Sequence, residues 1–372
     1  MRLSLLSTLF VVCTTTVSFA QSATDSMFEK LSAGTSHSLF IRNGLLYATG
    51  QNVYGQLGIA NKADALQPQQ VAGNDYLSVS TCTYNTVALK KDGSIWAWGY
   101  NNYGEVGNGN RTHQFSPSRV GKDTNWISVT AGESFCLAIK RNGSLWGWGI
   151  NSSGELGTGG NPYNSLTPIQ IGKENNWKMA VAGVKYVLAI KKDGTLWAWG
   201  ANAWGMLGTG DNTSRNTPTQ IGIDKNWAFV AAGQSHSLAI KTDGSLWAWG
   251  SNQNGELGIN SVVKQWQPVQ VGNSNNWKTA ACGQHHSVAI KKDGTLWSWG
   301  SNNNGGLGLG SPGNKRVPQQ IGSARDWIAV TAGMAHTMAM NTSNAVFAWG
   351  ANSYGELGIG NRMGQAVPVQ VK

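Results

Sequence analysis

The sequence predicts an all-β fold, a seven-bladed β-propeller built from seven repeats of about 50 residues. Three observations lead to this prediction: a fixed repeat period, short β-prone runs between tight turns, and no sustained helical periodicity. A period of this length is typical of propellers and solenoids, and four short strands per repeat close into a ring with few exposed edges. The period is visible in a glycine that recurs every 49 to 51 residues, at Gly50, Gly99, Gly149, Gly200, Gly250, Gly300 and Gly350.

The composition agrees with many short strands joined by turns. The chain of 372 residues has 49 glycines and 18 tryptophans, and only 12% of its residues are charged. Glycine suits tight turns, and tryptophan suits the half-buried surface of a strand. Sixteen of the 18 tryptophans occupy only three positions of the repeat, and the two exceptions are Trp204 and Trp266.

The first half of each repeat reads as a β-hairpin. Residues 237–240 are β-prone, Asp243-Gly244 forms a turn signal, and residues 246–249 are again β-prone. An Asp-Gly or Asn-Gly pair between such runs predicts a two-residue turn with positive φ at both positions. The same signal recurs at Asp92, Asp193 and Asp293, and as Asn-Gly at Asn43 and Asn142.

The second half of each repeat reads as a loop followed by an edge strand. The loop has the pattern N-x-x-G-[EQ]-L-G, whose glycines predict sharp turns. A proline and a short apolar run follow, and a proline in a strand favours its edge because it cannot donate a ladder hydrogen bond. The prolines are Pro68, Pro117, Pro168, Pro218, Pro268, Pro318 and Pro368.

The first 20 residues have the features of a secretory signal peptide. Arg2 precedes an apolar run over residues 3–12, and Ser18 and Ala20 are small residues at the −3 and −1 positions of a cut before Gln21. We therefore expect residues 1–20 to be removed and residues 21–372 to form a single secreted or periplasmic domain. No later apolar run has transmembrane length.

Three cysteines remain after this cleavage, and an odd number excludes complete pairing within the chain. Each replaces a small or apolar residue of the repeat, so Cys82, Cys136 and Cys282 are expected to be buried free thiols.

The combined pattern G-x-x-H-[ST]-x-A-[IL], D-G-x-[LI]-W-x-W-G-x-N-x-x-G-[EQ]-L-G-x-G and P-x-x-[IV] resembles the repeat of the regulator of chromosome condensation family. The resemblance covers the whole chain after residue 20 and implies a seven-bladed propeller. It does not imply one activity, because propellers host enzymes, inhibitors, photoreceptors and scaffolds. If the blade boundary were permuted, a strand near Leu31 would complete a blade with strands from the C-terminus.

Two activities of the family lack their sequence features here. The founding member catalyses nucleotide exchange on a small nuclear GTPase with a wedge-like insertion, whereas the length of these repeats varies by only one residue either way from 50. The tryptophans that plant photoreceptor relatives use are replaced after the repeat glycine by Gln234-Ser235, Gln284-His285 and Met334-Ala335. Nucleotide exchange is therefore only a distant third interpretation, and no catalytic residue and no cofactor is expected.

Four histidines share one repeat position. They are His37, His236, His286 and His336, from consecutive blades. Packed sheets lie about 10 Å apart, whereas zinc ligands converge to about 2 Å from one ion. A structural role is therefore expected for them, and no metal site.

Two surface features remain as candidate binding sites. The residue before the loop glycine is aromatic in four repeats, and exposed aromatic side chains bind proteins or glycans with little entropy loss. These candidates are Tyr54, Tyr103, Trp204 and Tyr354.

The second feature is a basic rim that flanks the hairpin turn. Together with the net charge of +10, it favours acidic partners such as nucleic acid, anionic glycans or a phospholipid surface. Its members are Arg42, Lys90, Lys91, Lys140, Arg141, Lys191, Lys192, Lys241, Lys291 and Lys292. The sequence thus predicts an exported, non-enzymatic scaffold for a protein or glycan partner, with a polyanion-binding or signalling propeller as the alternative.

Overall fold

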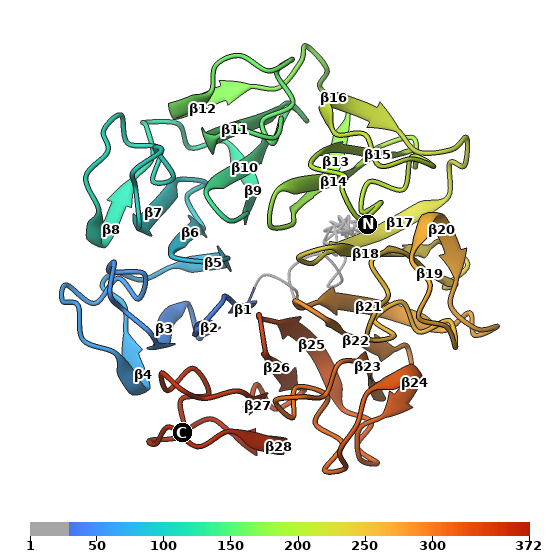
Figure 1. Cartoon of the computed structure of the whole chain (residues 1–372). Helices are drawn as coiled ribbons and strands as arrows, with labels where there is room; N and C mark the ends of the chain where they lie inside the picture. The colour runs from blue at the N-terminus through green and yellow to red at the C-terminus, as the bar shows by residue number, and fades with distance from the viewer. Residues whose placement is uncertain (1–29) are drawn as a thin grey trace, which may run out of the picture.

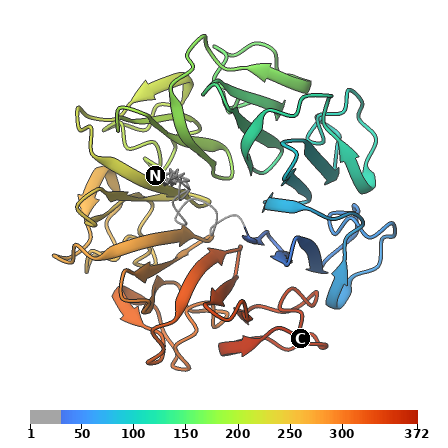
Figure 2. The same ribbon diagram turned by 180° about the vertical axis from the view of Figure 1, so that it is seen from behind.

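The computed structural model describes residues 30–372, so the predicted signal peptide lies outside the described residues. These residues form seven four-stranded antiparallel sheets arranged as a ring, which Figures 1 and 2 show from its two faces. The predicted all-β, seven-bladed propeller is confirmed.

Each blade is one continuous stretch of chain, and its strands pair in sequence order. The bounds are, for blade 1, β1 (Leu31–Ala33), β2 (His37–Arg42), β3 (Leu45–Gly50) and β4 (Ala65–Gln70); for blade 2, β5 (Tyr76–Thr81), β6 (Asn85–Lys90), β7 (Ile95–Gly99) and β8 (Gln114–Arg119); for blade 3, β9 (Trp126–Ala131), β10 (Phe135–Lys140), β11 (Leu145–Ile150) and β12 (Asn164–Gln170); for blade 4, β13 (Trp177–Ala182), β14 (Tyr186–Lys191), β15 (Leu196–Gly200) and β16 (Arg215–Gln220); for blade 5, β17 (Trp227–Ala232), β18 (His236–Lys241), β19 (Leu246–Gly250) and β20 (Gln265–Gln270); for blade 6, β21 (Trp277–Cys282), β22 (His286–Lys291), β23 (Leu296–Gly300) and β24 (Lys315–Gln320); and for blade 7, β25 (Trp327–Ala332), β26 (His336–Asn341), β27 (Val346–Gly350) and β28 (Gln365–Gln370).

The first strand of each blade lies toward the centre of the ring and the fourth lies on the outside (Figure 1). The repeat proline falls in this fourth strand, as with Pro268 in β20, so the predicted edge position is confirmed. One side of an outer strand pairs with no other strand. A residue without an N–H on that side therefore leaves no carbonyl group of the sheet without its hydrogen bond.

Because the strands alternate in direction, the connections separate onto two faces of the ring. The turn between strands 1 and 2 lies beside the loop between strands 3 and 4, and Tyr100 N–H donates to Tyr84 O across them at 2.9 Å. The turn between strands 2 and 3 lies beside the link to the next blade, where Arg141 N–H donates to Asn125 O at 2.8 Å. We call the first the loop face and the second the hairpin face.

The hairpin turns differ from the predicted type in most blades. In blade 1, Asn43 and Gly44 both have positive φ, as expected for a two-residue turn. At Asp92-Gly93 and its equivalents only the glycine has positive φ, and the turn is one residue longer, with Gly93 N–H donating to Lys90 O at 2.9 Å. The aspartate instead accepts a hydrogen bond from Ser94 N–H through its side chain at 2.9 Å, which favours this wider turn.

The ring closes without exchange of strands, so the conditional prediction of a strand near Leu31 joining the C-terminal blade is wrong. β1 pairs with β2 of its own blade. Closure instead uses side-chain hydrogen bonds between blades 7 and 1: the Ser38 hydroxyl bonds His336 Nε2 at 2.8 Å, and Thr49 Oγ1 donates to Gly355 O at 2.8 Å. A complete first blade makes a clasp unnecessary.

Tryptophans of the third strand hold neighbouring blades together. Trp249 is fully buried, and its Nε1–H donates to Met206 O in the preceding blade at 2.8 Å. Trp148 and Trp299 make the same bond to Glu105 O and Glu256 O. At Gly208, where φ is +72°, a Cβ would lie 2.8 Å from Trp249 Nε1, so glycine is required for this close approach.

Candidate functional site

The loop motif builds a rigid support on the loop face. Asn101 Oδ1 accepts a hydrogen bond from Val106 N–H at 2.9 Å, and its amide donates across the loop to Asn110 O at 3.0 Å. Glu105 is almost fully buried and accepts from Tyr103 N–H at 2.9 Å. Burial raises the pKa of the Glu105 carboxyl to about 7. The residue before the loop glycine is thus fixed by its backbone.

Tyr54 lies in a cluster of aromatic side chains at the boundary of blades 1 and 2. Its ring centre is 5.0 Å from that of Tyr84, 5.1 Å from Tyr100 and 5.4 Å from His113, with edge-to-face geometry in all three pairs. All four side chains are half-buried. We call this set the tyrosine cluster. It presents a fixed aromatic surface on the loop face, because each ring is held by the others.

The structure does not bring the four predicted aromatic residues into one site. Tyr54 and Tyr103 are half-buried, whereas Trp204 and Tyr354 are 43% and 37% exposed. Trp204 belongs to blade 4, so it lies apart from the other three on blades 7, 1 and 2. Their roles in binding stay a prediction, and Trp204 lies on a different part of the loop face.

The basic rim lies on the opposite, hairpin face, and five of its members are held within the blades. Lys241 Nζ lies 4.8 Å from the centre of the Trp227 ring and 4.1 Å from that of Trp247, and it pairs with Asp224 at 2.7 Å. Cation–π contacts of this kind orient the ammonium and remove it from solvent. The same position in other blades holds Lys90, Lys140, Lys191 and Lys291 over two aromatic rings each.

The remaining rim residues are more available to solvent. Lys91, Arg141, Lys192 and Lys292 are exposed, and Arg42 is half-buried over Phe40. The polyanion interpretation therefore depends on about half of the charges that the sequence assigned to it, and it stays a prediction.

The four repeat histidines bridge neighbouring blades. His236 Nε2 lies 2.9 Å from Ser287 Oγ, and the Ser287 hydroxyl donates to Glu256 O at 2.7 Å, so the serine oxygen accepts from Nε2–H. His286 and His336 make equivalent contacts with Thr337 and Ser38. These are the contacts of structural side chains.

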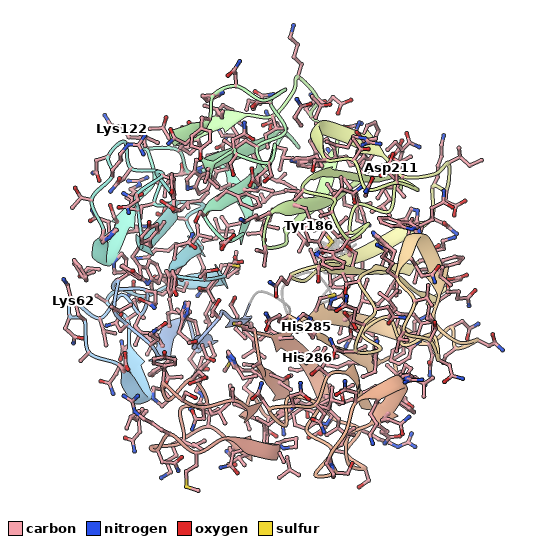
Figure 3. The ribbon with its side chains drawn as sticks, viewed as in Figure 1. Lys62, Lys122, Tyr186, Asp211, His285 and His286 are labelled. Atoms are coloured by element: carbon pink, nitrogen blue, oxygen red, sulfur yellow. The ribbon has the colours of Figure 1, made fainter. Side chains whose placement is uncertain are left out.

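Burial makes these histidines hard to protonate. It lowers the pKa of each to about 3, at His37, His236, His286 and His336. In blade 4 Tyr186 takes the same position and bonds Ser237 through its hydroxyl at 3.0 Å. Figure 3 shows Tyr186, His285 and His286 toward the centre of the ring, with Lys62 and Lys122 at its margin.

A cavity of about 300 Å³ opens at the centre of the loop face, lined by the first turn of all seven blades. Half of its lining residues are glycine or alanine, and the larger side chains are those of Glu133, Val184, Gln234, Gln284 and Met334. Glu133 forms an ion pair with Lys185 at 3.5 Å. Backbone bonds join the turns around the mouth, as where Met334 N–H donates to Gly34 O at 3.2 Å.

The cysteines and the potential metal ligands do not extend the candidate site. Cys136 and Cys282 are buried free thiols as expected, whereas Cys82 is free but only half-buried. Within residues 30–372 no group of three histidine, cysteine, aspartate or glutamate side chains is placed to hold a metal ion. In the same part of the chain no helix is long and apolar enough to span a bilayer.

The sequence prediction missed several surface aromatic residues. Tyr84, Tyr100 and His113 complete the tyrosine cluster, and Trp266 lies near Trp204 on the loop face. A usable signal was present, because each is a departure from the repeat consensus rather than part of it.

Comparisons with known proteins agree with the fold. Two family models, both described as the regulator of chromosome condensation (RCC1) repeat, match the chain. The first matches residues 43–89, 92–139, 142–190, 193–240, 243–290, 293–340 and 343–372. The second matches residues 78–105, 126–155, 227–256, 277–305 and 327–356.

Individual relatives are more distant. The ultraviolet-B receptor UVR8 of Arabidopsis thaliana is 33% identical over 194 residues, which are 50% of this chain and 44% of the receptor. The match thus spans less than half of that relative's length.

Two solved structures show the same fold at low identity. Yeast RCC1 (Prp20), in its crystal structure bound to Kap60, superposes with a TM-score of 0.81 at 19% identity, covering 94% of this chain and 86% of that one. Human WBSCR16 gives a TM-score of 0.80 at 21% identity, with 88% and 94% covered. Because the repeat matches span nearly all of residues 43–372, the chain belongs to the regulator of chromosome condensation repeat family.

Proposed function

We propose that the protein is an exported, non-enzymatic scaffold that binds a protein partner on its loop face. The observation that carries this proposal is the tyrosine cluster, in which aromatic side chains from two blades are held together and remain half-exposed. Rigid aromatic side chains dominate the binding energy of many protein interfaces, because they bury a large area at little entropic cost.

The family relationship supports a protein partner. One structure of similar fold is that of Prp20p from Saccharomyces cerevisiae, which is described with its binding to Gsp1p and histones, at 20% identity and a TM-score of 0.80. Another is the complex of yeast RCC1 with Kap60. A ring of seven rigid blades offers a broad surface for such partners. From the signal-peptide features of residues 1–20 we expect the partner in an envelope or outside the cell.

The proposal is tested with a pull-down from extracts of the native envelope and medium, using the chain from Gln21 as bait. The test variant replaces Tyr54, Tyr84 and Tyr100 with alanine together. The control replaces Tyr163, which is 59% exposed and lies outside the tyrosine cluster. We expect a protein that stays bound at high salt and is lost with the triple variant but not with the control.

Other outcomes contradict the proposal in distinct ways. A partner that elutes as salt rises would assign binding to the exposed lysines of the hairpin face, because contacts between exposed charges are screened. A glycan that binds through the tyrosine cluster would support the site but contradict the assignment of a protein partner. A partner that both variants retain equally would contradict binding through the tyrosine cluster, provided that both variants melt at the temperature of the unmodified protein.

A further inference from the structure

We propose a second recognition site on the loop face, at the boundary of blades 4 and 5, that binds a peptide segment in which an acidic residue is flanked by apolar residues. The two tryptophans that fall outside the repeat pattern both lie close to Lys264 there. Lys264 Nζ lies 5.7 Å from the centre of the Trp204 ring and 4.3 Å from that of Trp266. This site is independent of the tyrosine cluster, which is formed by blades 1 and 2.

Trp266 supports the site rather than lying open on it. It is the second residue of β20, and its carbonyl oxygen accepts a hydrogen bond from Gly210 N–H of blade 4 at 2.9 Å. Its ring packs against Gly205, where a Cβ would lie 2.6 Å from Trp266 Cε3. With Lys264 over the same ring, Trp266 fixes the position of the ammonium group, and Trp204 has the more open ring surface.

The surface around the ammonium is apolar. Trp204 is 43% exposed, and the adjoining segment places Val262 at 43% and Val263 at 63% exposure. Exposed valines have no polar group with which to bind sugar hydroxyls, whereas they gain free energy when apolar side chains cover them. We call Trp204, Val262, Val263, Lys264 and Trp266 the double-tryptophan patch. Its composition favours a peptide over a glycan.

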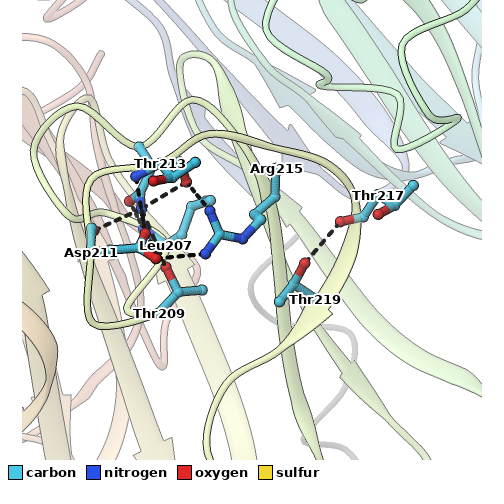
Figure 4. A network of polar contacts seen from close by, with 8 residues as sticks. Leu207, Thr209, Asp211, Thr213, Arg215, Thr217 and Thr219 are labelled. Carbon is cyan, nitrogen blue, oxygen red and sulfur yellow. Dashed lines mark hydrogen bonds and ion pairs between the residues drawn. The ribbon is translucent and has the colours of Figure 1, made fainter.

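The charge of the patch favours an acidic residue in that peptide. In the blade 4 loop that also carries Trp204, Arg215 and Asp211 pair at 2.7 Å and neutralise each other (Figure 4). Asp211 also accepts hydrogen bonds from Thr209 and Thr213, so its carboxylate is already occupied. Among residues 30–372, Lys264 has no ion-pair partner.

An unopposed ammonium beside apolar side chains is a selective site for a carboxylate. Docked apolar residues would exclude water around Lys264, and an ion pair is stronger where water is excluded. A neutral segment would leave the ammonium desolvated without a partner, which costs free energy. The patch therefore discriminates by charge as well as by shape.

The experiment selects binders for the folded chain from a random dodecapeptide library displayed on phage. A peptide with the recovered consensus is then synthesised, and its affinity is measured by calorimetry for the unmodified protein and four variants. The test variants are Trp204→Ala, Lys264→Gln and Val263→Asp. The control is Tyr163→Ala, which changes an exposed aromatic residue of blade 3 outside the double-tryptophan patch.

We expect a consensus with Asp or Glu between apolar residues. The affinity for this peptide should fall about tenfold or more with Trp204→Ala and about fivefold with Lys264→Gln, and less than twofold with the control. Val263→Asp adds a repelling charge at an exposed position, so it tests the site even if Trp204→Ala does not fold.

Three results overturn the proposal: no enrichment above protein-free beads, a consensus without an acidic residue, or affinities that the three test variants leave unchanged. Binding of an anionic oligosaccharide such as a heparin fragment, if lost with Trp204→Ala, would also overturn the peptide assignment. The pull-down that tests the tyrosine cluster has a separate outcome, because its variants leave the double-tryptophan patch intact.

Discussion

Lowering the pH from 8 to 5 should destabilise the ring by several kcal/mol, chiefly through the four bridging histidines. Burial lowers the pKa of each to about 3, below the 6.5 of an unperturbed histidine. The unfolded chain therefore takes up protons that the folded chain excludes. The stability is fully present above pH 6.5 and is lost progressively as the pH falls from 6.5 toward 3.

The size of this loss follows from the two pKa values. At pH 5 an unfolded histidine is almost fully protonated and a folded one is not, which costs about 2 kcal/mol for each residue and about 8 kcal/mol for the four. Glu105 acts in the opposite direction, because its raised pKa of about 7 means that the folded state gains a proton over the same range. This offsets about 2.5 kcal/mol, and Glu155 and Glu356, whose pKa values burial also raises, reduce the loss further, so we expect a net loss of at most about 5 kcal/mol.

Urea unfolding followed by tryptophan fluorescence at pH 8 and pH 5 measures the loss. The informative variant carries both His236→Tyr and His286→Tyr. It copies blade 4, where Tyr186 occupies the histidine position and forms a hydrogen bond to the next blade through its hydroxyl. This variant should lose about 4 kcal/mol less than the unmodified chain between the two pH values. Equal losses in both proteins would show that the histidines do not carry the acid sensitivity.

Three further predictions concern the contacts that hold the blades. Trp249→Phe removes the hydrogen bond to Met206 O but keeps most of the side-chain volume, so we expect the free energy of unfolding in urea to fall by about 1–3 kcal/mol. An unchanged free energy would contradict a stabilising role of this hydrogen bond. Lys241→Met should lower the free energy of unfolding by about 1 kcal/mol, whereas the same change at the exposed Lys192 should leave it almost unchanged. Equal effects would contradict a stabilising role for the cation–π contacts and ion pair of Lys241. Thr49→Val removes a hydroxyl that bonds carbonyl groups on both sides of the ring closure, and we expect its melting temperature to fall by a few degrees, as for a change of about 1–2 kcal/mol.

Most of the fold was predictable from the sequence because each blade repeats the same local sequence signals for strands and turns. Proline in the fourth strand, glycine in the loops and β-prone runs between turns act within one blade, and the structure follows them. The hairpin turn was predicted with the wrong geometry because the Asp92 side chain, and not the backbone preference alone, decides how the turn closes.

The candidate site was less predictable because it depends on neighbours in the next blade. The pattern that selected Tyr54 contained no information on Tyr84, Tyr100 or His113, which reach it across a blade boundary. Charge counting likewise placed Lys241 on the surface, whereas two indole rings and a carboxylate enclose it.

The sequence by itself determined the number of blades, the four strands in each and the edge position of the repeat proline, because these follow from a repeat of about 50 residues and from local turn and proline signals. Only the tertiary structure decided that the aromatic residues and the basic rim lie on opposite faces, and that Trp204 and Trp266 both lie close to Lys264. The physical reason is that blades contact each other through side chains at an angle set by packing, and contacts across that boundary have no signature along the chain.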